Sequence, residues 1–529
     1  MSILIKQLSY IHPNREILFQ NINLSISSGE KGSLIGNNGS GKSTLLQVLA
    51  GKMDISSGEI LLSEKPYFVP QHLGQYDNCS IAQVLGIEEK IRAFHRILEG
   101  NSSIEDFTLL DDDWNIEERV FSALNTWNLS HLDIFQSMQN LSGGEKTKIF
   151  LSGIAIHSPS IILFDEPSNH LDRKSRVQLY DFIQNNTSTM LVVSHDRTLL
   201  NLLPHTYELT KNGIQSYGGN YEFYKLKKEE NLEALQNQIS EKEKELRKSK
   251  KTAIDAMERQ QKQNSRGEKL NLKKGIPRIA MDTFKDQAER STSKLKGIHA
   301  DKISDISENL SNLRNQLSRT NGLKLNFEKT NLHQGKILVD AKEINFGYGN
   351  SFLWTHPLSF QIRSGDRKVI SGQNGCGKST LIKIITGQIN PQIGAFNRTN
   401  FKFIYVDQDY SIIDNHLSIY EQIQVFNSRK LLEHEIKMLL NRFLFPKETW
   451  DKRNENLSGG EKMRLLLCCL QTSNNMPDIF ILDEPTNNLD IQSLEILTQT
   501  IKDYQGTILL ISHDEYFVAE MNINSFIAL

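Results

Sequence analysis

The chain has 529 residues, which is too many for a single hydrophobic core and predicts two or three domains. Hydrophobic residues make up 38% and charged residues 23%, as in globular proteins, and no apolar run reaches the roughly 18 residues of a membrane span. The N-terminal MSILIKQLSY lacks the apolar core of a signal peptide, and the cysteines show no CxxC or metal-binding spacing. These features predict a cytoplasmic protein without a membrane domain. The net charge of −2 becomes informative only when it is divided along the chain.

A phosphate-binding loop is predicted between Leu34 and Gly51, where LIGNNGSGKSTLLQVLAG follows an apolar strand pattern and precedes a helical pattern. The sequence fits G-x-x-x-x-G-K-S, in which glycines let backbone N–H groups close on phosphates and the helix N-terminus adds its positive dipole end. Lys42 is expected to reach the β- and γ-phosphates, and Ser43 to bind Mg²⁺. The predicted nucleotide-binding residues here are Gly36, Asn37, Gly39, Gly41, Lys42, Ser43 and Thr44.

Later residues of the first half predict the chemistry of hydrolysis. IILFDE ends an apolar strand in two acids, of which Asp165 suits the Mg²⁺ shell and Glu166 suits the general base that polarises the attacking water. LVVSHD ends the next strand in His195, a candidate γ-phosphate sensor, and Gln71 in YFVPQH is expected to contact Mg²⁺ and the water. Alone, such acids are usually solvated and such a histidine is usually structural. The upstream phosphate loop favours the functional interpretation.

The central segment carries the positive charge. Between Lys225 and Lys329 the sequence has 25 Lys/Arg and 16 Asp/Glu, a net of +9, so the remainder carries −11. Apolar residues recur every seven positions from Leu232 to Ala253 and in a 3-4 alternation from Ile303 to Leu317. This pattern predicts two helices of about 40 residues, packed as a hairpin that projects about 60 Å. The alternative is a plain antiparallel coiled coil with a solvated basic face.

The tip of this hairpin is predicted in RGEKLNLKKGIPR, where Gly267, Gly275 and Pro277 would turn the chain. Its concentrated charge suits a polyanion, because each neutralised phosphate releases counterions. RNA is the polyanion that we favour. The predicted RNA-contacting residues are Arg266, Lys269, Lys273, Lys274 and Arg278.

The second half repeats the first at an offset of 336, so that ISGQNGCGKSTLIKIITG from Ile370 to Gly387 realigns without gaps. IFILDE supplies Asp483 and the second candidate base Glu484, LLISHD supplies His513, and IYVDQD supplies Gln408. The predicted metal ligands are therefore Ser43, Gln71 and Asp165 in the first copy and Ser379, Gln408 and Asp483 in the second. The predicted nucleotide-binding residues of the second copy are Gly372, Asn374, Gly375, Gly377, Lys378, Ser379, Thr380 and Gln408.

The pentapeptide LSGGE occurs at Leu141–Glu145 and at Leu457–Glu461, and it resembles the signature motif of ATP-binding cassette (ABC) proteins. That resemblance implies that ATP is sandwiched between the phosphate loop of one cassette and the signature of the other. Ser-Gly-Gly at a helix start offers a hydroxyl and N–H donors to the γ-phosphate. Site one would join Lys42, Glu166 and His195 to Ser458 and Gly460, and site two would join Lys378, Glu484 and His513 to Ser142 and Gly144.

The same resemblance implies an α/β fold with two P-loop NTPase cassettes, at residues 1–218 and 331–529, joined by a long α-helical hairpin linker at residues 219–330. We expect a Mg²⁺-dependent ATP hydrolase that works as a monomer with intramolecular cassette closure. Tyr10 is the candidate for adenine stacking in cassette one, whereas Phe346 and Tyr348 compete in cassette two. Cassette one also has 21 extra residues before its signature, and they include the acidic DFTLLDDDW. The signature residues expected to contact nucleotide are Ser142, Gly143, Gly144, Ser458, Gly459 and Gly460.

The whole layout resembles the ABC-F family of ribosome-associated ATPases, with a basic linker that begins at Gly219-Asn220-Tyr221 and an SHDR motif at Ser194–Arg197. This resemblance implies binding to rRNA and P-site tRNA on the ribosome in the ATP-bound state, with the linker near the peptidyl-transferase centre. Members modulate translation or give antibiotic resistance by ribosome protection. The main alternative is the ATPase subunit of an ABC membrane importer, which would need a membrane partner but no basic hairpin. A repair or chromosome ATPase would need a far longer coiled coil or zinc sites.

Overall fold

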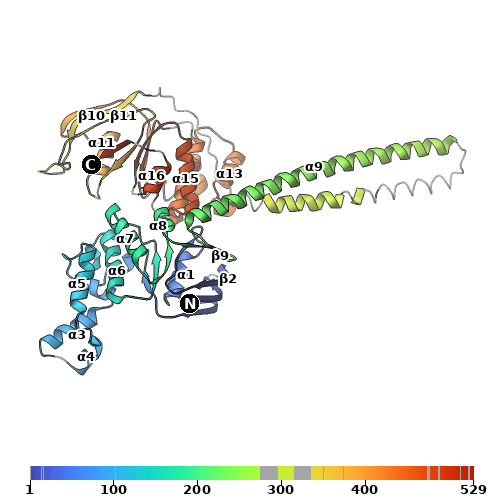
Figure 1. Ribbon diagram of the computed structural model, residues 1–529. Helices are drawn as coiled ribbons and strands as arrows, with labels where there is room; N and C mark the ends of the chain where they lie inside the picture. Colours follow the sequence, from blue (N-terminus) through green and yellow to red (C-terminus); the bar gives the residue numbers. More distant parts are fainter. Residues whose placement is uncertain are drawn as a thin grey trace. The chain divides into compact units, whose positions relative to one another are not determined.

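The chain divides into two compact units, one of Met1–Glu222 with Leu323–Leu529 and one of Phe223–Gly322 (Figure 1). The first unit holds both halves of the sequence repeat, called cassette one (residues up to 222) and cassette two (residues from 323). The second is called the helical unit. The computed structural model describes residues 2–13, 15, 17–101, 103–273, 293, 296–298, 300–314, 335–349, 351–372, 375–473, 477–486, 489–512, 514–521, 523 and 525–529.

Cassette one is built on a six-stranded sheet with the order β5-β6-β7-β3-β8-β9, parallel from β5 to β8 and antiparallel at β9. A smaller antiparallel sheet has the order β2-β1-β4. The strands are β1 (Ile3–Ile11), β2 (Ile17–Ile26), β3 (Lys31–Ile35), β4 (Ser57–Leu62), β5 (Tyr67–Val69), β6 (Ile161–Asp165), β7 (Thr189–Val193), β8 (His205–Thr210) and β9 (Gly213–Tyr217).

The helices of cassette one are amphipathic or capped segments between these strands. Three of them, α3, α4 and α5, occupy the longer stretch that precedes the first signature, and α3 and α4 pack on each other. The helices are α1 (Lys42–Leu49), α2 (Ile81–Val84), α3 (Glu88–Leu98), α4 (Ile104–Leu110), α5 (Ile116–Thr126), α6 (Gly143–His157), α7 (Arg173–Asn185) and α8 (Arg197–Asn201), with 3-10 turns at Gly74–Tyr76 and Met138–Asn140.

Buried strands fix where the acids of each site emerge. Strand β6 is buried along its whole length, and its alternate residues enter two different cores: Ile162 and Phe164 on one face, Ile161 and Leu163 on the other. A strand buried on both faces must be apolar throughout, which is why IILFD shows no polar alternation. Its first charged residue can therefore appear only at its carboxyl end, where ligands bind in α/β sheets.

Cassette two repeats this plan with a five-stranded parallel sheet of order β14-β15-β16-β12-β17 and an antiparallel sheet of order β11-β10-β13. The strands are β10 (Ile337–Asn345), β11 (Leu358–Arg363), β12 (Arg367–Ser371), β13 (Ile393–Arg398), β14 (Phe403–Val406), β15 (Ile479–Asp483), β16 (Thr507–Ile511) and β17 (Ser525–Ala528). The helices are α11 (Lys378–Thr386), α12 (Ile419–Phe426), α13 (Glu433–Arg442), α14 (Gly459–Thr472), α15 (Ile491–Asp503) and α16 (Glu515–Glu520), with 3-10 turns at Lys447–Thr449 and Asn454–Asn456.

In its described residues, the helical unit contains the 53-residue helix α9 (Tyr221–Lys273) and a second helical stretch over residues 300–314. Ile239 and Ala253 of α9 are buried, as are Ile306 and Leu310 of the second stretch, and Arg314 forms a 2.6 Å ion pair with Glu243. The apolar stripes predicted from the heptad spacing therefore pack against each other. Helix α9 continues through Gly267, where a turn was expected, because one glycine costs a helix only about 1 kcal/mol and does not end it.

The predicted fold class is confirmed, since the chain is α/β with two cassettes and a long helical segment between them. The expected turn residues Gly275 and Pro277 lie outside the described residues. None of the helices in the described part of the chain combines the length and the apolar character needed to cross a lipid bilayer.

Candidate nucleotide-binding sites

The first phosphate loop is shaped by a glycine and closed by its lysine. Gly41 has φ +96° immediately before α1, and a Cβ there would lie 2.8 Å from a Leu18 methyl carbon, so both conformation and space require glycine. The Lys42 ammonium is buried and donates to the carbonyl oxygens of Gly36 at 2.8 Å and Asn37 at 3.2 Å. The Lys42 ammonium therefore lies beside the space that phosphates occupy in such loops.

The loop is tied to the acidic strand by one hydrogen bond. The Ser43 hydroxyl donates to Asp165 Oδ1 at 3.0 Å. Burial raises the pKa of Asp165, and this hydrogen bond and Lys42 oppose that shift. The structure therefore brings together two of the residues predicted to hold Mg²⁺ in site one, and Gln71 lines the same cavity.

The two candidate bases share an unusual backbone conformation. Glu166 has φ +53° and Glu484 has φ +47°, a left-handed region that costs a non-glycine residue about 1 kcal/mol or more. In each, the backbone N–H donates at 2.8 Å to the end of the neighbouring strand, Val193 O for Glu166 and Ile511 O for Glu484. The same strained turn in both cassettes aims a buried carboxyl group into the cavity beside its phosphate loop.

His195 lies directly against Glu166. Its backbone N–H donates to Glu166 Oε2 at 3.2 Å, and its Nε2 lies 3.4 Å from Glu166 Oε1. Burial, and next the charge of Asp165, raises the pKa of Glu166 to about 8, whereas burial and then Lys42 lower the pKa of His195 to about 3. The imidazole is therefore neutral near pH 7, so its contact with the Glu166 carboxyl group is a polar contact and not an ion pair.

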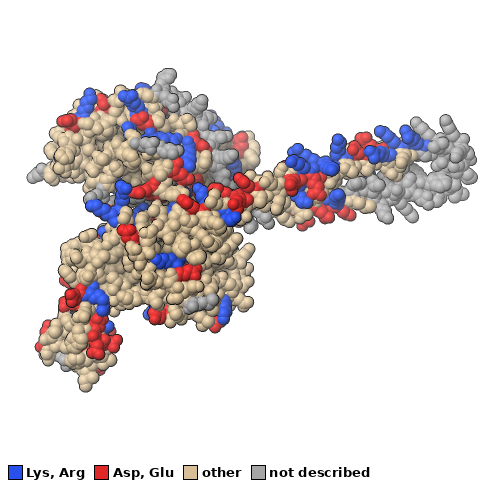
Figure 2. All heavy atoms as spheres, viewed as in Figure 1, with Lys and Arg blue, Asp and Glu red and all other residues tan. Residues whose placement is uncertain are grey.

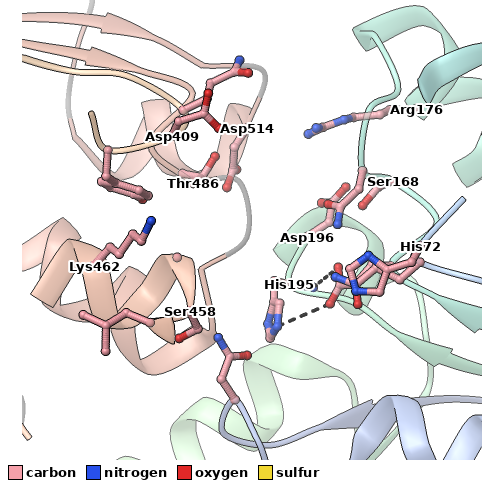
Figure 3. Close-up of a pocket in the computed structure, with 18 residues that line it drawn as sticks. His72, Ser168, Arg176, His195, Asp196, Asp409, Ser458, Lys462, Thr486 and Asp514 are labelled. Carbon is pink, nitrogen blue, oxygen red and sulfur yellow. Dashed lines mark hydrogen bonds and ion pairs between the residues drawn. The ribbon is translucent and has the colours of Figure 1, made fainter. Parts of the chain in front are cut away.

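The cavity of site one is lined by both cassettes and measures about 520 Å³ (Figure 3). Across the two sides, the Asn38 backbone N–H donates to Asp490 Oδ2 at 3.2 Å. Ser458 and Gly459 lie on the same cavity as Glu166 and His195, whereas Gly460 packs on the Ser493 side chain at the start of α15. The sequence did not single out other lining residues, which include His72, Arg176, Asp196, Lys462 and Asp514.

Both signature motifs cap a helix. Ser142 and Ser458 each accept a hydrogen bond from the N–H three residues on, at 3.3 Å, and the Glu at that position accepts the serine N–H in return at 2.8 Å. This reciprocal capping box fixes the starts of α6 and α14. It explains the fifth letter of LSGGE, because Glu145 and Glu461 hold the turn that presents the glycines.

Site two has a cavity of about 720 Å³ that is lined by the phosphate loop of cassette two and the signature of cassette one. Gly377 repeats the φ of +96° seen at Gly41, and the Lys378 ammonium donates to Gly372 O at 3.0 Å. The predicted residues Asn374 and His513 lie outside the described residues. Those on the cavity are Ser142, Gly143, Gly144, Gly375, Lys378, Ser379, Gln408, Asp483 and Glu484.

The metal-binding groups offered by the two sites are oxygen atoms of hydroxyl, carboxylate and amide groups, the donors that suit Mg²⁺. The described residues contain no group of three or more His, Cys, Asp or Glu that could hold a metal ion alone. The residues present therefore fit an ion that shares its coordination with nucleotide phosphates. In cassette two the Tyr405 hydroxyl donates to Asp483 Oδ2 at 2.9 Å, a contact that the sequence did not predict.

The aromatic residues expected on the adenine side lie in different surroundings in the two cassettes. Tyr10 is buried, 6.0 Å from the Phe19 ring and 5.5 Å from His12, so its faces are already covered. His12 and not Tyr10 lines the cavity beside the first phosphate loop. In cassette two, Tyr348 is 69% exposed and its hydroxyl lies 3.1 Å from Thr380 Oγ1, which favours it over the partly buried Phe346.

The predicted basic tip is described only in part. Arg266 is exposed on α9, Lys269 and Lys273 belong to the same helix, and Lys274 and Arg278 lie outside the described residues. The described charge extends much further back along α9 than the tip (Figure 2). Between Lys244 and Arg266 there are eight basic residues against three acids, and all eight are exposed: Lys244, Arg247, Lys248, Lys250, Lys251, Arg259, Lys262 and Arg266.

Comparison with known proteins leads to one family. The sequence profile described as "ABC transporter" matches residues 19–169 and 355–487. The ATP-binding protein Uup of Buchnera aphidicola subsp. Acyrthosiphon pisum (strain APS) is 30% identical over 522 residues, which are 96% of this chain and 78% of that protein. ABC transporter F family member 5 of Arabidopsis thaliana is 28% identical over 536 residues, 95% of this chain and 72% of that protein.

Two solved structures share the fold at low sequence identity. One is the complex of the archaeal ribosomal stalk protein aP1 with the archaeal ribosome recycling factor aABCE1, with a TM-score of 0.58, 18% identity and coverage of 99% of this chain and 87% of that one. The other is an RNase-L inhibitor, with a TM-score of 0.58, 18% identity and coverage of 98% and 86%. These likenesses show a common arrangement of two linked cassettes and nothing about activity.

Paired phosphate loops, acidic strand ends and signatures define the class of tandem ATP-binding cassettes that hydrolyse ATP. The chain belongs to this ABC family and, within it, to the ABC-F group.

Proposed function

We propose that this protein is a cytoplasmic ATPase that binds the ribosome when ATP holds its cassettes together, and that it acts on translation through its basic helical unit. The exposed row of Lys and Arg along α9 carries the proposal. Such a row attracts a polyanion, because phosphate contacts release counterions. An importer ATPase subunit has no comparable need for it.

RNA of the ribosome is the polyanion to test first. The aABCE1 protein that shares the tandem-cassette fold is described as a ribosome recycling factor, and an archaeal ABCE1 with a TM-score of 0.53 is described as ribosome-bound together with Pelota. By the family resemblance, the helical unit would reach rRNA and the P-site tRNA near the peptidyl-transferase centre. Conditions in which ATP keeps the two cassettes closed should then also strengthen ribosome binding.

In the proposed ATP cycle, each site uses groups from both cassettes. Lys42 binds the β- and γ-phosphates, Glu166 accepts a proton from the attacking water, and His195 contacts the γ-phosphate. Ser458 and Gly459 of the opposite cassette approach the γ-phosphate from the other side, so that ATP joins the cassettes and hydrolysis removes the shared contact. Lys378, Glu484 and Ser142 take the matching roles in site two.

Mg²⁺, when bound, neutralises phosphate charge and polarises the γ-phosphate. Ser43, Asp165 and Gln71 would hold it in site one, and Ser379, Asp483 and Gln408 in site two. Their own part is to orient oxygen donors toward the phosphates, and Asp165 is already held in place by the Ser43 hydroxyl.

Ribosome sedimentation tests this proposal. The full chain with Glu166→Gln and Glu484→Gln should bind ATP, remain closed and pellet with ribosomes, because the base that ends the cycle is missing. The matched control carries Lys42→Ala and Lys378→Ala and should stay in the supernatant. If the closed variant does not pellet in ATP, the ribosomal function is wrong and an importer subunit becomes the better hypothesis.

Charge reversal on the helical unit tests the RNA contact. Lys248→Glu, Lys250→Glu and Lys251→Glu together should weaken sedimentation at least about tenfold, since each lost phosphate contact lowers affinity, while ATP binding stays normal. The matched control reverses three exposed cassette lysines, Lys211, Lys430 and Lys447, and should sediment as before. Drug susceptibility of cells that express the protein tests whether the action on translation includes antibiotic protection.

A further inference from the structure

In each cassette a strand leads to the predicted glutamine, Gln71 or Gln408. This strand carries a different aromatic residue in the two cassettes. Phe68 of β5 pairs with Leu163, two residues before Asp165, and Tyr405 of β14 pairs with Ile481, two residues before Asp483. The two aromatic residues therefore occupy equivalent positions in the sheet. Phe68 is buried and has no polar atom, whereas Tyr405 adds a hydroxyl group at this position.

That hydroxyl changes what holds the strand-end aspartate. In site two, Tyr405 donates to Asp483 Oδ2 at 2.9 Å, and no hydrogen bond joins Ser379 to Asp483, although both lie within the described residues. In site one the partner of Asp165 is Ser43, at 3.0 Å. Asp165 is thus oriented by the phosphate loop, which itself binds nucleotide, and Asp483 is oriented by the sheet.

The residues on either side of the glutamine increase this difference. Gln71 lies between Pro70 and His72, and Gln408 lies between Asp407 and Asp409. Both aspartates line the cavity of site two together with Ser379, Asp483 and Glu484, and Asp409 also lines the cavity of site one. Asp407 is therefore the carboxylate that distinguishes the two sites. The Ser411 backbone N–H donates to Asp407 Oδ1 at 2.8 Å and keeps that carboxylate in its turn.

The Asp407 carboxylate repels the phosphates of ATP that carries no cation. Charges in a partly buried site are screened less than in water, so a cation must offset this repulsion before nucleotide can bind well. A cation also gains most from an aspartate that is already oriented, because less freedom is lost on binding. Ser43 is itself a predicted ligand of the ion, so its hydrogen bond to Asp165 competes with ion binding. Tyr405 is not a predicted ligand and can keep its hydrogen bond to Asp483 when the ion binds. Both effects therefore favour a stronger metal dependence in site two.

We propose that Tyr405 is a positioning residue for Asp483 and that, with Asp407, it makes site two the more metal-dependent of the two ATP sites. This inference rests on the proposed assignment of the ATP sites and is independent of ribosome binding. Site one would bind nucleotide with or without a divalent cation, and site two would bind it well only with one. Nucleotide would then fill site one before site two as the concentration of free Mg²⁺ rises.

Nucleotide binding without ribosomes tests the inference. Lys378→Ala leaves site one as the working site, and Lys42→Ala leaves site two. Each variant is titrated with fluorescent ATP in EDTA and in Mg²⁺, and the ratio of the two Kd values is the metal dependence. We expect this ratio to be at least about tenfold larger for site two, and equal ratios would overturn the inference.

The tyrosine is tested by exchanging the two aromatic residues. In the Lys42→Ala background, Tyr405→Phe should weaken Mn²⁺ binding in the presence of ATP about tenfold, measured by electron paramagnetic resonance, because one hydrogen bond to a charged group is lost. In the Lys378→Ala background, Phe68→Tyr is the matched control and should change Mn²⁺ affinity by less than about twofold, because Asp165 is already held by Ser43. Unchanged Mn²⁺ affinity in Tyr405→Phe would overturn the positioning role.

One outcome separates this inference from the function proposed above. If the closed double variant fails to sediment with ribosomes while the metal dependence still differs, the ribosomal proposal is wrong and this inference stands. A further variant, Asp407→Asn, checks the charge argument without touching Tyr405. It should tighten metal-free ATP binding to site two at least about threefold, and no change would remove this carboxylate from the explanation.

Discussion

The two ATP sites use the same motif letters but support them with different neighbours. Asp165 is held by the serine of its own phosphate loop, whereas Asp483 is held by a tyrosine of the adjacent strand. Cassette one also carries the additional helices α3 and α4, which cassette two lacks in its described residues. The comparison teaches that a repeated motif fixes which groups are present, while the surrounding sheet decides how firmly each one is oriented.

The largest expected difference comes from removing one phosphate lysine at a time. Lys42→Ala should weaken ATP binding at site one by about 100-fold or more and leave site two working, because a buried ammonium that contacts phosphates contributes several charge-assisted hydrogen bonds. Lys378→Ala should do the reverse. Equilibrium titration with fluorescent ATP counts the remaining sites. Loss of both sites in either single variant would show that the cassettes are not separable.

An effect of intermediate size is expected in the pH dependence of hydrolysis at site one. Burial and Asp165 raise the pKa of Glu166 to about 8, so the base is mostly protonated at pH 7. With site one isolated by Lys378→Ala, single-turnover hydrolysis should rise up to about tenfold per pH unit between pH 6 and 8 and then level off. Glu166→Gln should abolish the rise. A flat profile would show that nucleotide binding lowers this pKa or that another group is the base.

The smallest effect is expected in the additional helices of cassette one. Ser103 caps α4, its side chain accepting the Asp106 N–H while Asp106 accepts the Ser103 N–H. Ser103→Ala should lower the free energy of unfolding of cassette one by about 1 kcal/mol and leave ATP binding at both sites unchanged. Thermal unfolding and the same ATP titration measure the two quantities. A change in ATP affinity would mean that these helices support site one.

Much of each site could be predicted from the sequence because its parts are local. Three parts of each site depend on residues only a few positions apart: the phosphate loop, the acids at the strand end and the LSGGE capping box. Gly41 and Gly377 adopt a left-handed backbone conformation that the phosphate-loop motif predicts. The fold class followed from the same repeat.

The rest depended on contacts between distant residues. The hydrogen bond from Tyr405 to Asp483 exists only through the register of β14 on β15, which no spacing in the sequence encodes. The burial of Tyr10 follows from packing against Phe19 of β2, and it leaves His12 on the cavity. Helix α9 passed through Gly267 because the weak helix preference of one glycine is small beside the propensity of its many neighbours.

The left-handed backbone at Glu166 and Glu484 has a consequence for how such a protein can change over time. At a positive φ, glycine is the residue that the local backbone favours, so replacing either glutamate by glycine would relieve strain and stabilise the fold while removing the candidate base. Stability and activity therefore favour different residues at these two positions. A cassette released from the need to hydrolyse ATP would be expected to lose its glutamate there before it loses the surrounding strands.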